Sequence, residues 1–354
     1  MKAKKILSML LVLVISLSAL GCGAGNSGKT KETTRVFTDS TGRQVTIDST
    51  ITKIAVSGPL AQIVVFALAP EKLVGIATKW DSSAEEFLDT KYYNLPVLGQ
   101  LYGGKGEMNL EELLSAAPQV VIDIGESKDG IKEDLDKLQA QTGIPFVHID
   151  AYTDSMDKTY NMLGELLGME KEAKKIASYC EEVYSQTVKL SGSVQKKNIL
   201  YITGEKGLNV IAKGSYHGEI IDLLSNNIAV LDNPSSKGTG NEVDMEQILR
   251  WNPEVILFSP DSIYSTVKDN PDWKNVEAIK NGNYYEVPMG PYNWMGFPPS
   301  VQRLLGMMWM EKLLYPDKAD YDLYDKVSEY FKLFYHCDIT KDQYNKLMEN
   351  SIGK

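Results

Sequence analysis

The sequence predicts an α/β protein whose two lobes are joined by a long helix. Three observations support this prediction. The chain has 354 residues, and because one hydrophobic core rarely organises so many, two domains of roughly 100 to 200 residues each are expected. Strand-like and helix-like patterns alternate on both sides of a continuous helical stretch, which is typical of parallel βα units. Finally, one segment of the first half recurs in the second half.

The N-terminus has the pattern of an export signal. Lys2, Lys4 and Lys5 precede an apolar run over residues 6–20, which is typical of a signal peptide. The run is about 15 residues long, shorter than the ~20 that a membrane-spanning helix needs. The chain is therefore expected to be exported.

A cysteine follows this run directly. The tetrapeptide Ala19-Leu20-Gly21-Cys22 resembles a bacterial lipobox, although Ala19 stands where Leu is usual. The resemblance implies that residues 1–21 are a lipoprotein signal peptide and that lipid on Cys22 anchors the protein to the outer face of the cell membrane, on the periplasmic side or at the cell surface. An ordinary signal peptide cut elsewhere, or an uncleaved anchor, is the alternative. Residues 22–34 contain almost no large apolar side chain and are expected to form a flexible tether.

The charge of the mature chain excludes one class of function. Removing residues 1–21 takes away three of the 37 basic residues and none of the 47 acidic ones, so the net charge falls from −10 to −13. Nucleic-acid binding needs a basic face. We therefore expect no nucleic-acid partner.

The first lobe is expected over residues 35–154. A hairpin is indicated around Ser40-Thr41-Gly42-Arg43, and strands and helices then alternate. The expected strands are 36–39, 44–47, 53–57, 73–77, 120–124 and 145–149, and the expected helices are 59–68, 110–116 and 130–142.

Residues 155–192 are expected to form connecting helices with a break at Gly168. The second lobe and terminal helices are then expected over residues 193–350. Cys180 and Cys337 either form one disulfide or remain two buried free thiols. The expected strands are 198–202 and 255–259, and the expected helices are 219–224, 245–251 and, after Pro298-Pro299, 300–314.

The two lobes contain an internal repeat. Residues 108–124 align without a gap on residues 243–259, an offset of 135 residues. Glu111 coincides with Glu246, and each copy reads as an acidic short helix, a proline stop and a buried strand. The lobes therefore look like two copies of one unit.

These features resemble the class III, rigid-helix periplasmic binding proteins of ABC importers, which deliver iron-siderophores, haem or cobalamin. The resemblance covers about residues 36–347. It implies two Rossmann-like lobes, a bridging helix of about 20 residues and a ligand cleft between the lobes. The motifs that carry it are Thr38 to Thr46, Lys53 to Val56, Ala67 to Gly75, the two repeat copies and Ala278 to Pro288.

The same resemblance implies a partner, the ABC permease dimer with its ATPase. One exposed glutamate on each lobe would dock to the permease, and the matching positions are Glu111 and Glu246. Two carboxylates on equivalent loops would present a two-point charge pattern to a two-fold partner. The alternative is that each glutamate only stabilises the first turn of its helix. The receptor itself is expected to be a monomer.

The ligand is expected against loops at the carboxyl ends of the strands. Aromatic residues recur in these loops and would form a wall for a planar or aryl metal chelate such as an iron-siderophore, haem or corrinoid. Arg303 would either hold an anionic ligand or pair with a carboxylate inside the protein, and Lys105 is a weaker candidate of the same kind. The aromatic candidates are Trp80, Tyr102, Tyr216, Tyr292 and Trp294.

Two other functions remain open. A small oxyanion such as molybdate or tungstate would need a nest of backbone amides with an Arg or hydroxyls. A hydrolase is disfavoured because the sequence has no Gly-x-Ser-x-Gly, His-Glu-x-x-His or P-loop motif. With only three His, a bare metal-ion site is disfavoured too, although His217 could contact the metal of a bound complex. We expect a binding protein with no resident metal or cofactor, not an enzyme.

Overall fold

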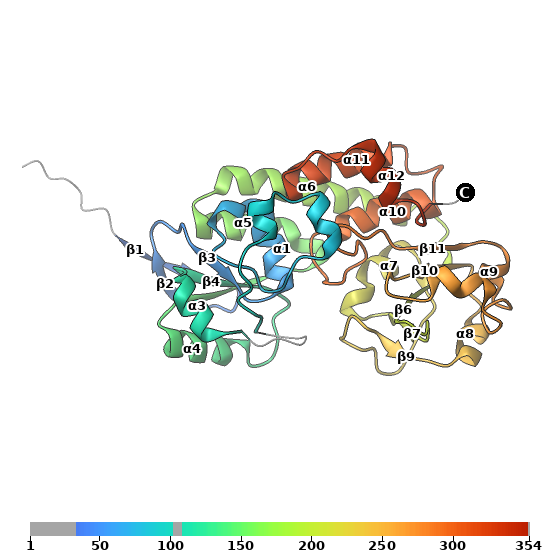
Figure 1. The fold of residues 1–354 in the computed structure, drawn as a ribbon, viewed down its shortest axis with the longest axis horizontal. Helices are drawn as coiled ribbons and strands as arrows, with labels where there is room; N and C mark the ends of the chain where they lie inside the picture. The colour runs from blue at the N-terminus through green and yellow to red at the C-terminus, as the bar shows by residue number, and fades with distance from the viewer. Residues whose placement is uncertain (1–32, 102–107, 353–354) are drawn as a thin grey trace, which may run out of the picture. The chain divides into compact units, whose positions relative to one another are not determined.

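The computed structural model describes residues 33–101 and 108–352, and from Thr34 onward the chain forms one compact unit (Figure 1). The expected signal peptide and lipidated Cys22 lie outside the described residues, as do Tyr102 and Lys105. No helix in the part that is described is long and apolar enough to cross a bilayer.

The N-terminal lobe is built on a three-stranded parallel sheet in the order β3-β4-β5, preceded by the antiparallel hairpin β1-β2. The strands are β1 (Thr34–Thr38), β2 (Gln44–Asp48), β3 (Ile54–Val56), β4 (Val120–Gly125) and β5 (Phe146–Asp150). The helices of this lobe are α1 (Pro59–Leu68), α2 (Thr90–Tyr93), α3 (Leu110–Ala116) and α4 (Ile131–Thr142).

Successive residues of each buried strand face opposite sides of this sheet, because side chains alternate along a strand. Ile122 belongs to the core on the α1 side, whereas its neighbour Val121 packs in a separate cluster with Leu113 of α3 and Leu135 of α4. The uninterrupted apolar run of β4 is therefore explained by helices on both faces.

Two helices connect the lobes. They are α5 (Met156–Leu167) and α6 (Glu170–Ser191), separated at Gly168, which has φ +64° and ends α5 in the left-handed conformation. The long helix α6 contacts α1 of the first lobe and α7 of the second. The expected continuous helical region and its break are both confirmed.

The C-terminal lobe has a mixed sheet whose parallel part runs in the order β8-β6-β10-β11, with β7 and β9 added antiparallel. Its strands are β6 (Asn198–Thr203), β7 (Asn209–Val210), β8 (Asn226–Asn227), β9 (Asn241–Glu242), β10 (Val255–Phe258) and β11 (Tyr284–Glu286). Its helices are α7 (Glu219–Leu224), α8 (Met245–Trp251) and α9 (Glu277–Lys280).

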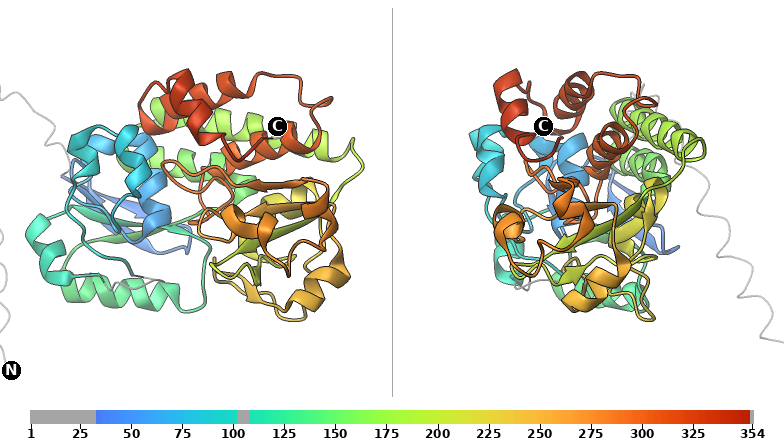
Figure 2. Two further views of the ribbon diagram at one scale, coloured as in Figure 1. Left: turned by 45° about the vertical axis from the view of Figure 1, so that its right-hand side comes forward. Right: turned by 90° about the vertical axis from the view of Figure 1, so that its right-hand side faces the viewer.

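Three helices close the chain, namely α10 (Arg303–Leu314), α11 (Leu323–Tyr330) and α12 (Lys341–Leu347), with one π-helical turn at Phe331–Tyr335. Helix α10 packs against α6, α7 and α11, and both views in Figure 2 show it among these helices. The largest core cluster contains Val147 of the first sheet, Leu257 of the second and Leu305 of α10. The two sheets therefore share one hydrophobic core.

The predicted repeat is confirmed in three dimensions. Helices α3 and α8 are capped at their N-termini by the side chains of Asn109 and Asp244, and both end in a left-handed residue, Ala117 (φ 47°) or Asn252 (φ 46°). A proline and a buried parallel strand follow in each copy.

Two local expectations need comment. Residues 73–77 do not form a strand but make single parallel bridges, Ile54 to Leu73 and Ile76 to Val97, because the chain turns away after each contact. Cys180 and Cys337 are both free thiols, so the disulfide alternative is not realised.

The left-handed caps generate a stability prediction. Alanine at φ 47° carries a Cβ penalty of about 1–2 kcal/mol, whereas glycine has none but loses more chain entropy on folding. Ala117→Gly should therefore raise the free energy of unfolding by about 0.5–1 kcal/mol, measured by urea denaturation. Ser115→Gly, in the exposed helical part of α3, is the matched control and should lower it by about 0.5 kcal/mol. Equal destabilisation by both variants would contradict the argument.

Candidate ligand-binding cleft

A cleft of about 570 Å³ lies between the two lobes. On the N-terminal side it is lined by the residues that follow β3 and by the end of β4, including Ser57 and Asp123. Strand β3 has a neighbour on each side in this sheet. Leu73, which follows β3 in sequence, bridges to it on one side, and β4 pairs with it on the other. The cleft therefore lies at the topological switch point, where α/β sheets bind ligands.

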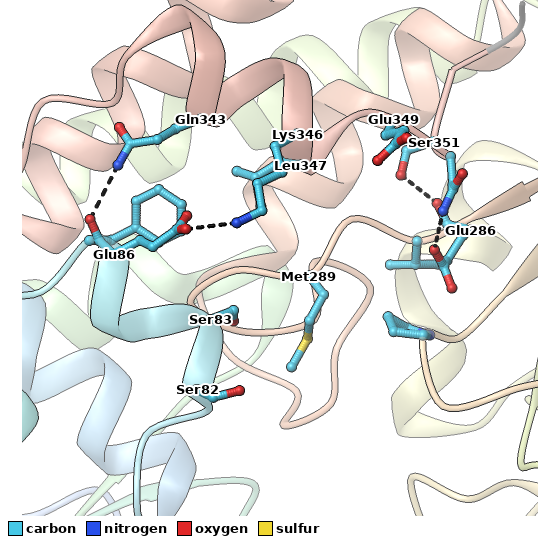
Figure 3. Close-up of a pocket in the computed structure, with 14 residues that line it drawn as sticks. Ser82, Ser83, Glu86, Glu286, Met289, Gln343, Lys346, Leu347, Glu349 and Ser351 are labelled. Atoms are coloured by element: carbon cyan, nitrogen blue, oxygen red, sulfur yellow. Dashed lines mark hydrogen bonds and ion pairs between the residues drawn. The ribbon is translucent and has the colours of Figure 1, made fainter.

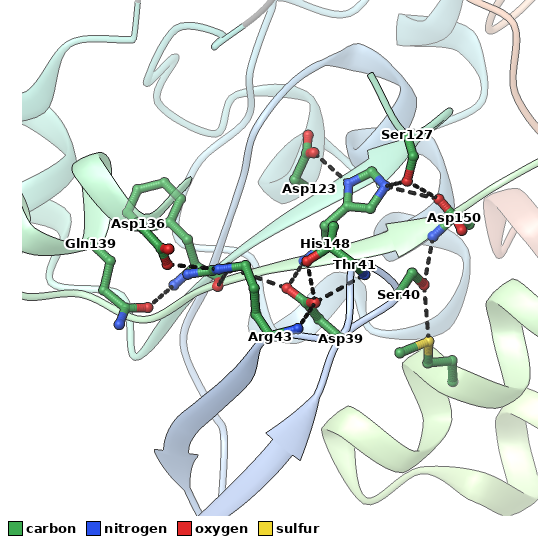
Figure 4. A network of polar contacts seen from close by, with 12 residues as sticks. Asp39, Ser40, Thr41, Arg43, Asp123, Ser127, Asp136, Gln139, His148 and Asp150 are labelled. Carbon is green, nitrogen blue, oxygen red and sulfur yellow. Dashed lines mark hydrogen bonds and ion pairs between the residues drawn. The ribbon is translucent and has the colours of Figure 1, made fainter. Parts of the chain in front are cut away.

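A hydrogen-bonded network begins at Ser57 and Asp123, which line the cleft on this side, and Figure 4 shows it from Asp123 onward. The Ser57 hydroxyl donates to Asp123 Oδ1, and Asp123 Oδ2 lies 2.7 Å from Nδ1 of His148. The other ring nitrogen of His148, Nε2, lies 3.1 Å from Asp150 Oδ1, which also accepts from Ser127 at 2.6 Å. Both nitrogens of one buried imidazole thus face carboxylates.

The hydrogen-bonded network continues away from the cleft into the β1-β2 hairpin. The backbone N–H of His148 donates to Asp39 Oδ2 at 3.3 Å, and Arg43 Nη1 donates to the same oxygen at 3.1 Å. Arg43 also donates from Nε to Asp136 at 2.8 Å and from Nη1 to the carbonyl of Phe146 at 2.8 Å. The hairpin is thereby tied to the edge of the sheet.

Two opposing effects act on His148. Burial lowers the pKa of the ring, but the hydrogen bonds and charges of Asp123 and Asp150 outweigh it, so the pKa of His148 is raised above its usual value. A carboxylate on each side favours the protonated imidazole. The two carboxylates therefore hold the ring in place beneath the cleft.

The C-terminal side of the cleft carries the rings of Tyr216, His217 and Phe297 beside a polar segment, residues 236–239. His217 Nδ1 contacts the carbonyl of Gly296 at 2.9 Å, and the carbonyl of Ser236 also interacts with the ring. Burial lowers the pKa of His217. Because its interactions are with the main chain, the ring ties together the loops that carry Ser236 and Phe297.

Arg303 lies one layer behind this wall. Its guanidinium, almost fully buried, donates to Thr153 Oγ1 at 2.8 Å and also contacts Glu219 Oε2 and the carbonyl of Tyr216. It lies 4.8 Å from the centre of the Tyr216 ring. Of the two expected roles, the geometry shows the structural one, pairing with a carboxylate.

The five expected wall residues do not gather at the cleft, although Trp80 and Tyr292 contact each other with ring centroids 5.6 Å apart. Tyr216 lines the cleft, and Tyr102 lies outside the described residues. Trp80 packs edge-on against Phe66 at 5.0 Å and donates to the carbonyl of Tyr92 at 3.1 Å. It therefore faces the core of the first lobe and not the cleft.

Tyr292 and Trp294 are also core residues. The Tyr292 hydroxyl accepts from Gln62 Nε2 at 2.9 Å, and the indole of Trp294 donates to the carbonyl of Gly290 at 3.1 Å. Their loop lies on α10, where a Cβ on Gly306 would come 2.4 Å from the Trp294 carbonyl oxygen. The Trp294 backbone therefore lies directly against α10, and both rings are buried.

The loop that begins at Ser57 was expected at the cleft and does line it, whereas sequence reasoning missed Phe297 and the pairing of Asp123 with His148. Phe297 lies three residues after the expected wall residue Trp294, and it is 54% exposed although it is large and apolar. An aromatic residue between a glycine and two prolines was the available signal. The buried chain from Ser57 to His148 joins three strands and left no local motif.

The expected docking residues are exposed. Glu111 lies in the first turn of α3 and Glu246 in the first turn of α8. Within the described ranges neither carboxylate forms an ion pair. The helices that carry them are equivalent in the repeat. In Figure 1 both helices lie on the side opposite α6.

Another hollow, of about 400 Å³, lies beside the C-terminal helix (Figure 3). Several of its polar side chains are bonded to one another: Lys346 Nζ lies 2.7 Å from Glu86 Oε1, and Asn350 Nδ2 donates to Glu286 at 2.9 Å. These contacts hold the chain end against both lobes. We therefore take the larger cleft as the candidate site.

Comparison with known proteins agrees with this geometry. A family model described as "Periplasmic binding protein" matches residues 63–289. The molybdate-binding protein MolA of Haemophilus influenzae is 24% identical over 97% of this chain and 99% of its own length. The Fe(3+)-citrate-binding protein YfmC of Bacillus subtilis is 26% identical over 79% and 88%. The heme uptake protein IsdE of Staphylococcus aureus is 25% identical over 65% and 78%.

Solved structures are similar over most of the chain. An ABC transporter solute-binding protein from Sulfurospirillum deleyianum superposes with a TM-score of 0.81 at 27% identity, covering 89% of this chain and 99% of that one. A periplasmic solute-binding protein from Veillonella parvula gives 0.76 at 27% identity, over 90% and 98%.

The raised pKa of His148 beneath the cleft predicts a pH dependence of stability. A raised pKa means that His148 stabilises the folded state at low pH, and that this contribution is lost as the pH rises through the folded pKa. The difference in unfolding free energy between wild type and His148→Gln should be larger at about pH 5.5 than at pH 9. Urea denaturation at both pH values measures it, with His336→Gln, an exposed histidine outside the network, as control. A difference independent of pH would contradict the raised pKa of His148.

Proposed function

The chain belongs to the periplasmic binding protein family, and on this basis we propose that it is the receptor of an ABC importer for a metal chelate. The chelate would be an iron-siderophore, haem or corrinoid, captured in the cleft between the lobes and delivered to the permease without being chemically changed. Members of this family are exported binding proteins.

The size and lining of the cleft carry this proposal. Its volume of about 570 Å³ falls within the range of about 300–1,000 Å³ of small-molecule sites. A tetrahedral oxyanion would fill only a small part of it. The wall combines the rings of Tyr216 and Phe297 with the polar floor at Ser57 and Asp123, which suits a ligand with both apolar and hydrogen-bonding surfaces.

Two relatives support a chelate as the ligand. The names of YfmC and IsdE state that they serve Fe(3+)-citrate and heme, and both ligands are metal complexes larger than a bare ion. Within the described residues no cluster of three or more His, Cys, Asp or Glu could hold a metal ion. We therefore expect the metal to enter already complexed.

A small oxyanion such as molybdate is the second candidate. MolA matches this chain over nearly its whole length. The N-terminus of α1 opens on the cleft with Gly58 as its cap and no side-chain hydrogen bond to its first amides, and such amides bind anions. Ser57 and Lys237 lie on the same cleft and would complete the site.

The receptor has to be attached to the membrane and has to reach the permease. We propose that lipid on Cys22 holds it at the outer face of the membrane and that residues 22–34 give it reach. Glu111 and Glu246 would then dock a monomeric receptor to the permease dimer, because they present one carboxylate on each of two equivalent helices.

The ligand is tested directly with a chain that begins at Gly23. Haemin, ferric citrate and sodium molybdate are each titrated by isothermal calorimetry and native mass spectrometry. We expect one chelate to bind 1:1 with a Kd of about 1 μM or lower and molybdate at least about 100-fold more weakly. Binding of molybdate alone would overturn the chelate in favour of the second candidate. No binding of any of the three would count against both.

Docking is tested in the complete importer. Glu111→Lys and Glu246→Lys should each lower the transport rate by about tenfold, because a reversed charge meets the permease, while the ligand Kd changes less than about twofold. Glu112→Lys, also exposed in the first turn of α3, is the matched control. If all three variants transport equally, these carboxylates do not dock.

A further inference from the structure

A second, smaller chamber opens beside the cleft in the C-terminal lobe. It has a volume of about 310 Å³ and shares Gly238, Thr239 and Phe297 with the cleft. Its remaining lining is polar, with side chains of Tyr201, Thr203, Asn209, Ser259 and Asp261. The two hollows are therefore neighbours separated by the Phe297 ring and the backbone of Gly238 and Thr239.

The chamber occupies the switch point of the second sheet. Tyr201 and Thr203 end β6, and Ser259 follows the last residue of β10. From β6 the chain pairs β8 on one side and β10 on the other, so the β6–β10 boundary is where a ligand is expected. Because β4 and β10 are equivalent in the repeat, this chamber is the counterpart of the Ser57–Asp123 floor.

Phe297 is held in place between the two hollows. A Cβ on Gly238 would come 2.2 Å from Phe297 Cδ2 and 3.0 Å from His217 Cε1, so the ring lies directly on the Gly238 backbone. Gly296 precedes it at φ +120°, where a Cβ would come 2.8 Å from Arg303 Nε. Glycine is needed at both positions. The exposed ring is thus a fixed partition, not a mobile surface residue.

Several polar atoms of the chamber can accept a hydrogen bond from a ligand, while the Tyr201 hydroxyl already accepts one from Asn293 Nδ2 at 3.1 Å. The Thr203 hydroxyl already donates to the carbonyl of Thr239 at 2.8 Å, so its free lone pairs can only accept. Asp261 offers an exposed carboxylate. Burial raises the pKa of Tyr201 to about 12, so its hydroxyl stays neutral. No basic side chain lines this chamber in the described part of the chain, which disfavours an anion there.

We propose that the chamber is a subsite for a hydroxyl- or ammonium-bearing arm of the ligand. The arm would pass over the Phe297 ring, which lines both the cleft and the chamber. The subsite rests on the proposed function and narrows it. The chelate body lies against Tyr216 and Phe297 in the cleft, and the arm donates to Asp261 and the hydroxyls behind the partition. A ligand of this kind is extended and is larger than an oxyanion.

The test compares two ferric trihydroxamates that differ only in the arm. Ferrioxamine B carries a terminal ammonium, and its N-acetyl derivative has the same chelate core without the charge. By calorimetry on the full body from Gly23, we expect ferrioxamine B to bind at least about fivefold more tightly than the derivative. Asp261→Asn should abolish this difference, and Phe297→Ala should weaken both ligands. Asp272→Asn, an exposed aspartate outside both hollows, should behave as wild type.

The outcomes separate the two proposals. Haemin, ferric citrate and molybdate are titrated against the same variants. If one of the chelates binds but neither Asp261→Asn nor Phe297→Ala changes its affinity, the subsite is wrong and the receptor stands. Equal affinity for the two trihydroxamates in the wild type also overturns the subsite. Binding of molybdate alone overturns it, and binding of no probe removes the proposed function together with the subsite.

Discussion

The contact between the Trp294 backbone and α10 is the constraint on which the C-terminal side of the cleft depends. Gly306 allows α10 to approach the Trp294 carbonyl. Arg303, three residues before Gly306 on α10, packs against Gly296. The Gly296 carbonyl in turn holds the ring of His217 through a contact of 2.9 Å with Nδ1. The contacts at Gly306 and Gly296 require residues without a side chain, and the contact of Arg303 requires a buried charge. The aromatic wall is therefore set by backbone geometry and not by the rings themselves.

The two lobes use one scaffold for different chemistry. The equivalent helices α3 and α8 lead into equivalent strands, yet the first switch point carries a histidine bonded to Asp123, while the second carries the hydroxyls of Tyr201 and Ser259 beside the carboxylate of Asp261. Repetition of the backbone thus preserves where a ligand can lie, and the side chains that follow each strand decide what it can be.

Local signals made much of the fold predictable. The expected helices 59–68 and 110–116 match α1 and α3 residue for residue, because Pro59 and Asn109 mark their starts by chemistry that acts within one turn. The site was less predictable, since Trp80 and Trp294 occur in loops whose composition does not reveal which face is buried. Orientation there depends on contacts with α10 and Phe66 that are distant in sequence.

The shared core has a consequence for how the molecule unfolds. Leu257 of the second sheet and Val147 of the first belong to one apolar cluster that runs through α10, so neither lobe buries its inner face alone. Cutting the chain within α6 would leave two halves with exposed cores. The lobes are distinct in architecture but form one cooperative unit in thermodynamic terms, and melting of either should carry the other with it in a single transition.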